Sequence, residues 1–354
     1  MHKILPRWAL ALACLPICAP ANAAPAIAKF PVPGARIPLF PTMGPDGAVW
    51  AGVSTGAVIR VTDDGAISTF PLPNSEATAA AITTGPDGDL WFTEIDSKSE
   101  RSVARLTTAG HVDAFALPAG TRIPIGIAAG SDGNVWFTDD RTRNGDFSGE
   151  VGRVTSTGTV VEMPVPASAG EPLLLTAGPD GALWFTAHSQ SGNAIVRVTT
   201  GFDFSILPLS LGTFDALGIA LGADGNFWFT AIDPNTKNGK IGRMTPEGAI
   251  TLFPIAAPGA NPQLIAAGPC SDLWFTSAAG IGRVTLDGKI TVFPFSDLRQ
   301  TEFLSGVAVD ANRNVWFSDQ VGMAMARVAL VGCRALAQVS KETDRKPPKI
   351  REGR

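Results

Sequence analysis

Short apolar stretches alternate with polar residues along most of the chain, and glycine-rich turns separate them. Residues 85–95 are typical: Gly-Pro-Asp-Gly forms a turn, and Leu-Trp-Phe-Thr-Glu-Ile follows it as an apolar segment. The sequence contains 38 glycines and 28 prolines, which is too many for long helices. The pattern therefore predicts an all-β chain of many short strands.

Seven of the eight tryptophans recur at nearly even intervals. They occupy positions 50, 91, 136, 184, 228, 274 and 316. A period of about 40–50 residues with strand-like content is typical of β-propeller blades. Each period contains an apolar strand, the Trp strand, a third strand such as Ile241-Gly242-Arg243-Met244 and a fourth such as residues 250–254. We therefore expect four-stranded antiparallel blades.

The fourth strand indicates how the ring closes. Six copies follow their own Trp strands, but the seventh, Ile27-Ala28-Lys29-Phe30-Pro31, stands near the N-terminus. The last period lacks a fourth strand, so the N-terminal segment should supply it and remove the open edge. The sequence predicts an all-β, seven-bladed β-propeller over 24–333, closed by the N-terminal strand pairing into the last blade.

The two ends of the chain differ from this repeat. Residues 1–23 have a basic start, a short apolar centre and an Ala-x-Ala end, as in a secretory signal peptide, so we expect a periplasmic or secreted protein. Residues 334–354 end in a charged, proline-broken run that predicts a disordered tail. After signal removal Cys270 and Cys333 remain, and they are either a disulfide or two buried thiols.

Charge and composition exclude some classes of function. The net charge is −4, which argues against nucleic acid as a partner, and the absence of tyrosine excludes phenolic acid–base chemistry. We expect a monomer that does not span a membrane. The recurring Asp-Gly pairs lie in different blades, so we interpret them as turns and not as calcium ligands.

The Gly-Pro-Asp-Gly-x-Leu-Trp-Phe-Thr-Glu text, the Ile-Gly-Arg-Val-Thr strand and the Phe-Pro strand together resemble the streptogramin B lyase (virginiamycin B lyase) family. This resemblance implies a Mg²⁺-dependent elimination that opens the ester linkage of a cyclic depsipeptide. It also implies a catalytic histidine before the innermost strand of late blades, and two glutamates that hold the metal.

The family's histidine has no counterpart here. The equivalent positions are Leu39, Ala80, Ile125, Leu173, Leu217, Gln263 and Ser305. None of these residues exchanges a proton near neutral pH. Phe303 stands at the first metal position beside Glu302, and Gln320 stands at the second beside Asp319. A one-residue shift in register would restore a carboxylate pair, Glu302 and Asp319, as candidate Mg²⁺ ligands.

Polar loops after the Trp strands should surround a channel mouth that Leu39, Ile125, Leu173 and Leu217 line. The candidate binding residues there are Glu94, Asp139, Asp140, Asp233, Gln263, Ser305 and Gln320, and the candidate catalytic residues are His188 and Asp319. Glu94, Asp139 and Asp319 end equivalent strands and could converge near the axis. An apolar funnel with a polar rim suits a partly apolar ligand or peptide.

Three functions remain open at this point. The first is a non-catalytic propeller that binds a small molecule or a partner at the channel mouth. The second is a Mg²⁺-dependent carbon–oxygen lyase acting on a cyclic depsipeptide ester. The third is a metal-dependent lactone hydrolase.

Overall fold

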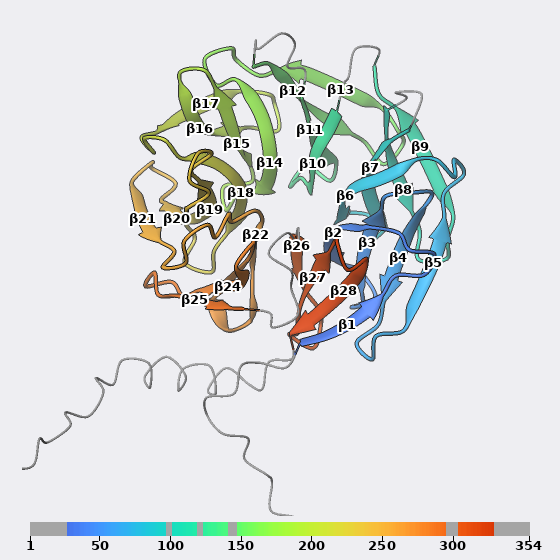
Figure 1. The fold of residues 1–354 in the computed structure, drawn as a ribbon. Coiled ribbons are helices and arrows are strands. Elements are labelled where there is room, and N and C mark those ends of the chain that lie inside the picture. Colours follow the sequence, from blue (N-terminus) through green and yellow to red (C-terminus); the bar gives the residue numbers. More distant parts are fainter. Residues whose placement is uncertain (1–26, 97–100, 119–122, 141–146, 295–303, 329–354) are drawn as a thin grey trace, which may run out of the picture.

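The computed structural model describes residues 27–96, 101–118, 123–140, 147–294 and 304–328. These residues form seven four-stranded antiparallel sheets arranged in a ring (Figure 1). The prediction of a seven-bladed β-propeller is confirmed. The blades are numbered one to seven in chain order, starting with the sheet that contains β2.

Every blade has the same strand order from the axis outwards. The innermost strands are β2 (Pro38–Met43), β6 (Thr78–Thr84), β10 (Ile123–Ala129), β14 (Glu171–Ala177), β18 (Asp215–Leu221), β22 (Ile265–Ala267) and β26 (Leu304–Val309). The tryptophan-bearing second strands are β3 (Val49–Val53), β7 (Leu90–Ile95), β11 (Val135–Asp140), β15 (Leu183–Ser189), β19 (Phe227–Ile232), β23 (Leu273–Ser277) and β27 (Val315–Asp319). The third strands are β4 (Ala57–Val61), β8 (Arg101–Leu106), β12 (Gly149–Val154), β16 (Gly192–Val198), β20 (Gly239–Met244), β24 (Gly280–Val284) and β28 (Ala324–Val328). The outermost strands are β5 (Ile67–Pro71), β9 (Val112–Ala116), β13 (Val160–Pro164), β17 (Phe204–Leu209), β21 (Ile250–Pro254), β25 (Ile290–Phe293) and, in blade seven, β1 (Ile27–Pro31).

The N-terminal strand closes the ring as the sequence predicts. β1 pairs antiparallel with β28, and the blue and red ends of the ribbon meet in one sheet (Figure 1). The Phe30 ring lies 5.3 Å from the Trp316 ring, centroid to centroid. The last sheet therefore has its fourth strand, and the edge of β28 is covered.

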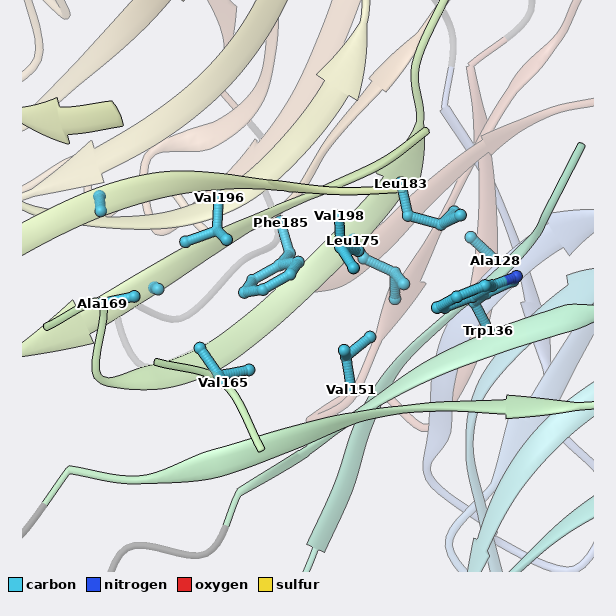
Figure 2. Packing of buried hydrophobic residues seen from close by; sticks show 12 residues of the cluster. Ala128, Trp136, Val151, Val165, Ala169, Leu175, Leu183, Phe185, Val196 and Val198 are labelled. Carbon is cyan, nitrogen blue, oxygen red and sulfur yellow. The ribbon is translucent and has the colours of Figure 1, made fainter. Parts of the chain in front are cut away.

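Apolar side chains fill the space between neighbouring blades. Figure 2 shows the layer between blades three and four, where Trp136 and Val151 face Leu175 and Phe185. These four side chains are at most 8% exposed. Large aromatic groups contribute most of the buried area in such layers, which explains why a tryptophan recurs once per blade.

A hydrogen-bonded aspartate accompanies six of these seven tryptophans on one face of the ring. We call this the turn face; it carries the turns between each innermost strand and its Trp strand. In blade four, Trp184 Nε1 donates to Asp180 Oδ1 at 3.1 Å, and Arg197 Nε lies 2.5 Å from Asp180 Oδ2. Arg197 is also the cross-strand partner of Trp184. We call this arrangement the Asp–Trp–Arg latch.

The aspartate–arginine pair of the latch is also present in blades one to three, and the tryptophan–aspartate hydrogen bond recurs more widely. The tryptophan–aspartate pairs of the other blades that have the hydrogen bond are Trp50–Asp46, Trp91–Asp87, Trp136–Asp132, Trp228–Asp224 and Trp316–Asp310. An arginine is the cross-strand partner of the tryptophan in all seven blades. The aspartates also cap their turns, since Ala182 N donates to Asp180 Oδ1. The interpretation of these aspartates as turn residues is confirmed, and their bond to the tryptophan is a further role.

A glycine makes room for the latch. A Cβ at Gly178 would lie 2.3 Å from Trp184 Nε1, well inside van der Waals contact. Gly181, at the other end of the same turn, has a φ of +77°, which disfavours other residues. These two requirements account for the repeated Gly-x-Asp-Gly text.

Blade six departs from this pattern. Cys270 stands where the aspartate would be, is disulfide-bonded and has a φ of 65°. Asp272, two residues before Trp274, pairs instead with Arg283 at 2.5 Å. Trp274 Nε1 is buried and has no hydrogen-bond partner within the described part of the chain. One blade therefore lacks the tryptophan hydrogen bond.

Several predictions fall on residues that the structure does not describe. These are the signal peptide at 1–23, Glu302, Cys333 and the tail at 334–354. The disulfide of Cys270 agrees with the cysteine prediction, while its pairing with Cys333 stays a prediction. No helix in the described ranges is long and apolar enough to cross a membrane.

Candidate functional site

The seven innermost strands enclose a small apolar cavity on the axis. Its volume is about 130 Å³. Each blade contributes two consecutive residues at its innermost strand: Phe40, Pro41, Ala81, Ile82, Gly126, Ile127, Leu174, Leu175, Gly218, Ile219, Leu264, Ile265, Gly306 and Val307. No titratable side chain is among them, so the cavity accommodates an apolar group and does not supply acid–base chemistry.

The residues that line the cavity differ from those that the sequence predicts at the channel mouth. Leu39, Ile125, Leu173 and Leu217 were expected to line the channel mouth, and none of the four is among the residues that line this cavity. In each blade the lining residues are the two that follow the position equivalent to Leu39. The pairing register shifts at this point in six innermost strands, for example between Pro172 and Leu175. Such a bulge changes which side chains point inwards.

Buried hydroxyl groups hold these bulges in place. Thr138 Oγ1 accepts a hydrogen bond from Gly126 N of its own blade and donates to the carbonyl of Leu173 in the next. Thr230 makes the same two contacts with Gly218 N and the carbonyl of Gln263. The backbone at the family's histidine position is thus fixed by the blade before it.

Two candidate residues of blade seven are in direct contact. Gln320 Nε2 donates to Ser305 Oγ at 2.8 Å, and Ser305 is 7% exposed. Both side chains are neutral over the physiological pH range. The structure therefore brings together the residues at the family's histidine and second metal positions, as a hydrogen-bonded pair without charge.

Asp319 has a different environment from the one expected. Its side chain is fully buried, and Lys29 Nζ of the N-terminal strand lies 3.0 Å from Oδ2. Gly322 N donates to Oδ1 at 2.7 Å. This carboxylate joins β27 to β1 and so contributes to ring closure.

The remaining acidic candidates are separated. Glu94 accepts a hydrogen bond from Ser102 in its own blade. Asp139 is fully buried and accepts one from Ile123 N. Glu94, Asp139 and Asp319 do not form a group of carboxylates within 4.8 Å of one another, so the structure does not bring them together as ligands of one ion. Each ends a second strand of a different blade, with its own partners.

Asp233 and Gln263 stabilise local backbone. Asp233 accepts hydrogen bonds from Asn235 N and Thr236 N, and the first of these is the main cause of its lowered pKa. Gln263 Nε2 donates to Asn261 Oδ1 at 3.0 Å. Asp140 ends β11, opposite Ile123.

One acidic cluster lies within blade three. Oxygen atoms of Asp139, Glu150 and Glu162 lie within 4.8 Å of one another. Each of these carboxylates has a further interaction with another residue. Proximity of acidic groups alone does not indicate a bound metal, so we assign no ion to this cluster.

His188 lies on the opposite side of the ring from the latches. We call this side the mouth face; it carries the loops after the Trp strands and those leading into the innermost strands. His188 Nδ1 lies 3.3 Å from Asn193 Oδ1 and 3.4 Å from Asp215 Oδ1 of the next blade. The Phe147 ring meets the imidazole edge-on at 4.9 Å. His111, in contrast, lies in the β8–β9 turn and is 72% exposed.

Comparison with known proteins identifies the family of this chain. A family model described as the virginiamycin B lyase family matches residues 24–328. The chain belongs to that family. No protein of curated function matches the sequence.

Solved structures agree with the family assignment. A streptogramin B lyase is 29% identical with a TM-score of 0.73, and the match covers 85% of this chain and 96% of that one. A catalytically inactive histidine-to-alanine variant of virginiamycin B lyase from Staphylococcus aureus, with quinupristin, is 30% identical with a TM-score of 0.76. That match covers 86% of this chain and 99% of the other. A putative gluconolactonase, 17% identical over 72% of this chain and 90% of that one, has a TM-score of 0.51 and shows only a common fold.

The family resemblance implies magnesium, which prefers carboxylate and water oxygens. In the described part of blade seven, the one predicted carboxylate ligand, Asp319, is held by Lys29. Its neighbour Gln320 carries no charge and is bonded to Ser305. These residues do not fit a magnesium ion as the family pattern would place it.

Proposed function

We propose that this chain is an exported binding protein of the virginiamycin B lyase family, which takes a partly apolar small molecule or peptide at the mouth face without breaking it. The observation that carries the proposal is the neutral Ser305–Gln320 pair at the family's catalytic positions. An elimination needs a group that removes a proton, and a serine hydroxyl or an amide does not do this near neutral pH.

The apolar cavity supports the binding half of the proposal. Its seven-fold ring of apolar side chains and its volume of about 130 Å³ suit a ring-sized or short alkyl group. Polar groups of the loops around it would contact the rest of the ligand. Export rests on residues 1–23 and is part of the proposal.

Quinupristin, the compound bound to the Staphylococcus aureus variant, is the direct probe. The chain is incubated with quinupristin and Mg²⁺, followed by liquid chromatography with mass detection, and binding is measured by calorimetry. The proposal expects binding with unchanged compound. An active virginiamycin B lyase serves as the positive control for ring opening.

The chromatogram separates the alternatives because the reactions differ in mass balance. Elimination would give a product of the same mass with a new retention time, which would establish the lyase. Hydrolysis would give a product heavier by one water, which would establish the lactone hydrolase. Absence of binding would contradict the proposal for this class of ligand.

A further inference from the structure

His188 contacts residues of its own blade and of both neighbouring blades. His188 is the second-last residue of β15, and it lies directly opposite Glu171 on the innermost strand β14. The equivalent positions of four other blades hold Ile95, Asp140, Ile232 and Gln320. The blade fold therefore does not require a histidine at this position. The contacts of His188 need an explanation other than blade packing.

The orientation of the Asn193 amide fixes the hydrogen on the imidazole. Asn193 Nδ2 donates to the carbonyl of Phe214 and to Asp215 Oδ1, and Asn193 Oδ1 accepts from Ala216 N at 3.0 Å. The atom that faces His188 Nδ1 is therefore the amide oxygen. Both neighbours of Nδ1 are acceptors, so Nδ1 carries the hydrogen of the neutral ring.

This arrangement leaves Nε2 as a hydrogen-bond acceptor. Asn193 is 8% exposed, whereas the His188 side chain is 29% exposed, so a buried network holds a ring that solvent reaches. Phe147 packs edge-on against the ring and restricts its rotation. The cost of burying the Asn193 amide is met by four hydrogen-bonding contacts, all directed at one histidine and the start of the next blade.

We infer that His188 Nε2 accepts a hydrogen bond from an N–H or O–H group of the ligand, while an apolar part of the same ligand enters the central cavity. This inference rests on the proposed function. β14, paired with β15 at this point, also supplies Leu174 and Leu175 to the cavity wall. The ligand class is therefore a peptide or other amide- or amine-bearing compound with a compact apolar group.

The charges around His188 favour a donor over an anion. Asp215 of β18 and Glu171 of β14 are the acidic groups nearest to it on the neighbouring strands. The cation Lys240 of β20 lies over the Phe214 ring, with Nζ 4.0 Å from the centroid. A carboxylate or phosphate placed at Nε2 would face these acids, whereas an amide N–H or an ammonium group would not be repelled.

Protonation of the imidazole would change which hydrogen-bonding groups of a ligand His188 can bind. A second hydrogen on Nε2 converts the acceptor into a donor, and Asp215, Glu171, Asn193 and Lys240 keep their positions. A donor ligand should therefore bind the neutral ring more tightly than the protonated ring.

The tautomer can be measured without a ligand. Nitrogen-15 NMR of the full chain at pH 8 should show His188 with hydrogen on Nδ1 and an unprotonated Nε2. His111 is an internal control, because its Nε2 faces Asp113 Oδ1 at 3.1 Å and should carry the hydrogen. A His188 resonance with hydrogen on Nε2 would overturn the inference and leave the proposed function standing.

The binding test compares wild type, His188→Ala, His188→Gln and His111→Ala with quinupristin at pH 8. Loss of one hydrogen bond should weaken binding of His188→Ala about tenfold at pH 8. His188→Gln should recover part of this loss, because its amide oxygen is an acceptor, and His111→Ala should bind like wild type.

Two results contradict the inference in different ways. If His188→Ala binds as tightly as wild type, His188 does not contact the ligand, although the chain remains a binding protein. If wild type binds no quinupristin, the proposed function fails for this ligand class and the inference fails with it. Circular dichroism of each variant confirms that the fold is intact.

Discussion

The two faces of the propeller follow different rules. On the turn face, six blades repeat one tryptophan–aspartate hydrogen bond, with an arginine beside the tryptophan in all seven. On the mouth face, equivalent positions hold unrelated residues, such as Asp140, His188 and Gln320. Groups that every blade needs for packing repeat, while groups that contact a ligand need to be placed only once. Lack of repetition is therefore the better guide to function in this fold.

Asp319 lies on the mouth face but has a structural contact, so it tests the distinction between packing groups and ligand-contacting groups most directly. It lies at the mouth end of β27, yet it is fully buried and paired with Lys29. Lys29→Met leaves the buried carboxylate without its cation; because the Lys29 side chain is 34% exposed, the cost should be about 2 kcal/mol, below that of breaking a fully buried pair. We expect the free energy of unfolding in urea to fall by about that amount.

The control for this prediction is Lys237→Met, an exposed lysine on the same face, which should have little effect. A double variant, Lys29→Met with Asp319→Asn, should recover much of the loss because no charge stays buried. If Lys29→Met is as stable as Lys237→Met, the pair does not stabilise the closed ring, and Asp319 returns as a candidate for ligand contact.

A second prediction compares the latch of blade four with the altered blade six. Trp184→Phe removes a hydrogen bond to Asp180, whereas Trp274→Phe removes an indole N–H that has no partner in the described residues. Both variants lose similar volume. Trp184→Phe should therefore cost about 1 kcal/mol more unfolding free energy than Trp274→Phe. Equal losses in urea titrations would mean that the latch hydrogen bond contributes nothing net.

The smallest expected effect is a difference in acid response. Burial opposes ionisation of Asp132, but hydrogen bonds from Asn134 and Trp136 outweigh it and hold its pKa below the ordinary 3.8. This carboxylate therefore contributes stability above pH 3.8, and the contribution is lost as the pH falls through its lower folded pKa. Asp132→Asn should lose less stability than wild type over that range.

Asp272 should behave in the opposite way. Burial raises its pKa above 3.8, although Arg283 partly offsets this effect. Its ionised form is disfavoured in the folded state, so stability should rise as the pH falls through its raised pKa. Asp272→Asn should remove this rise. Unfolding free energies measured from pH 6 to pH 3 check both signs, and the same sign for both aspartates would contradict the comparison.

The sequence was sufficient for the fold. Tryptophan spacing predicted the blade count, and the displaced Phe30-Pro31 strand predicted the closing partner, because both are local patterns. The latch was also visible, with an aspartate four residues before most tryptophans and an arginine in the third strand, but the aspartates were interpreted only as turn residues.

The site was harder to predict because it depends on contacts between distant parts of the chain. Nothing in the sequence around Asp319 indicates that Lys29 is its partner. The bulges in the innermost strands moved the cavity wall from Leu39 to Phe40 and Pro41, and a bulge of one residue leaves no clear mark in the sequence. The absence of the family's histidine, in contrast, could be established position by position.

The pairing of β1 with β28 also sets an order of events during biogenesis. The first strand to leave the ribosome must wait for the last one, so an incomplete chain has an uncovered edge at each end. Until β28 is made, β1 has no partner strand, so a chain truncated before residue 324 should expose this edge to proteases and to other chains.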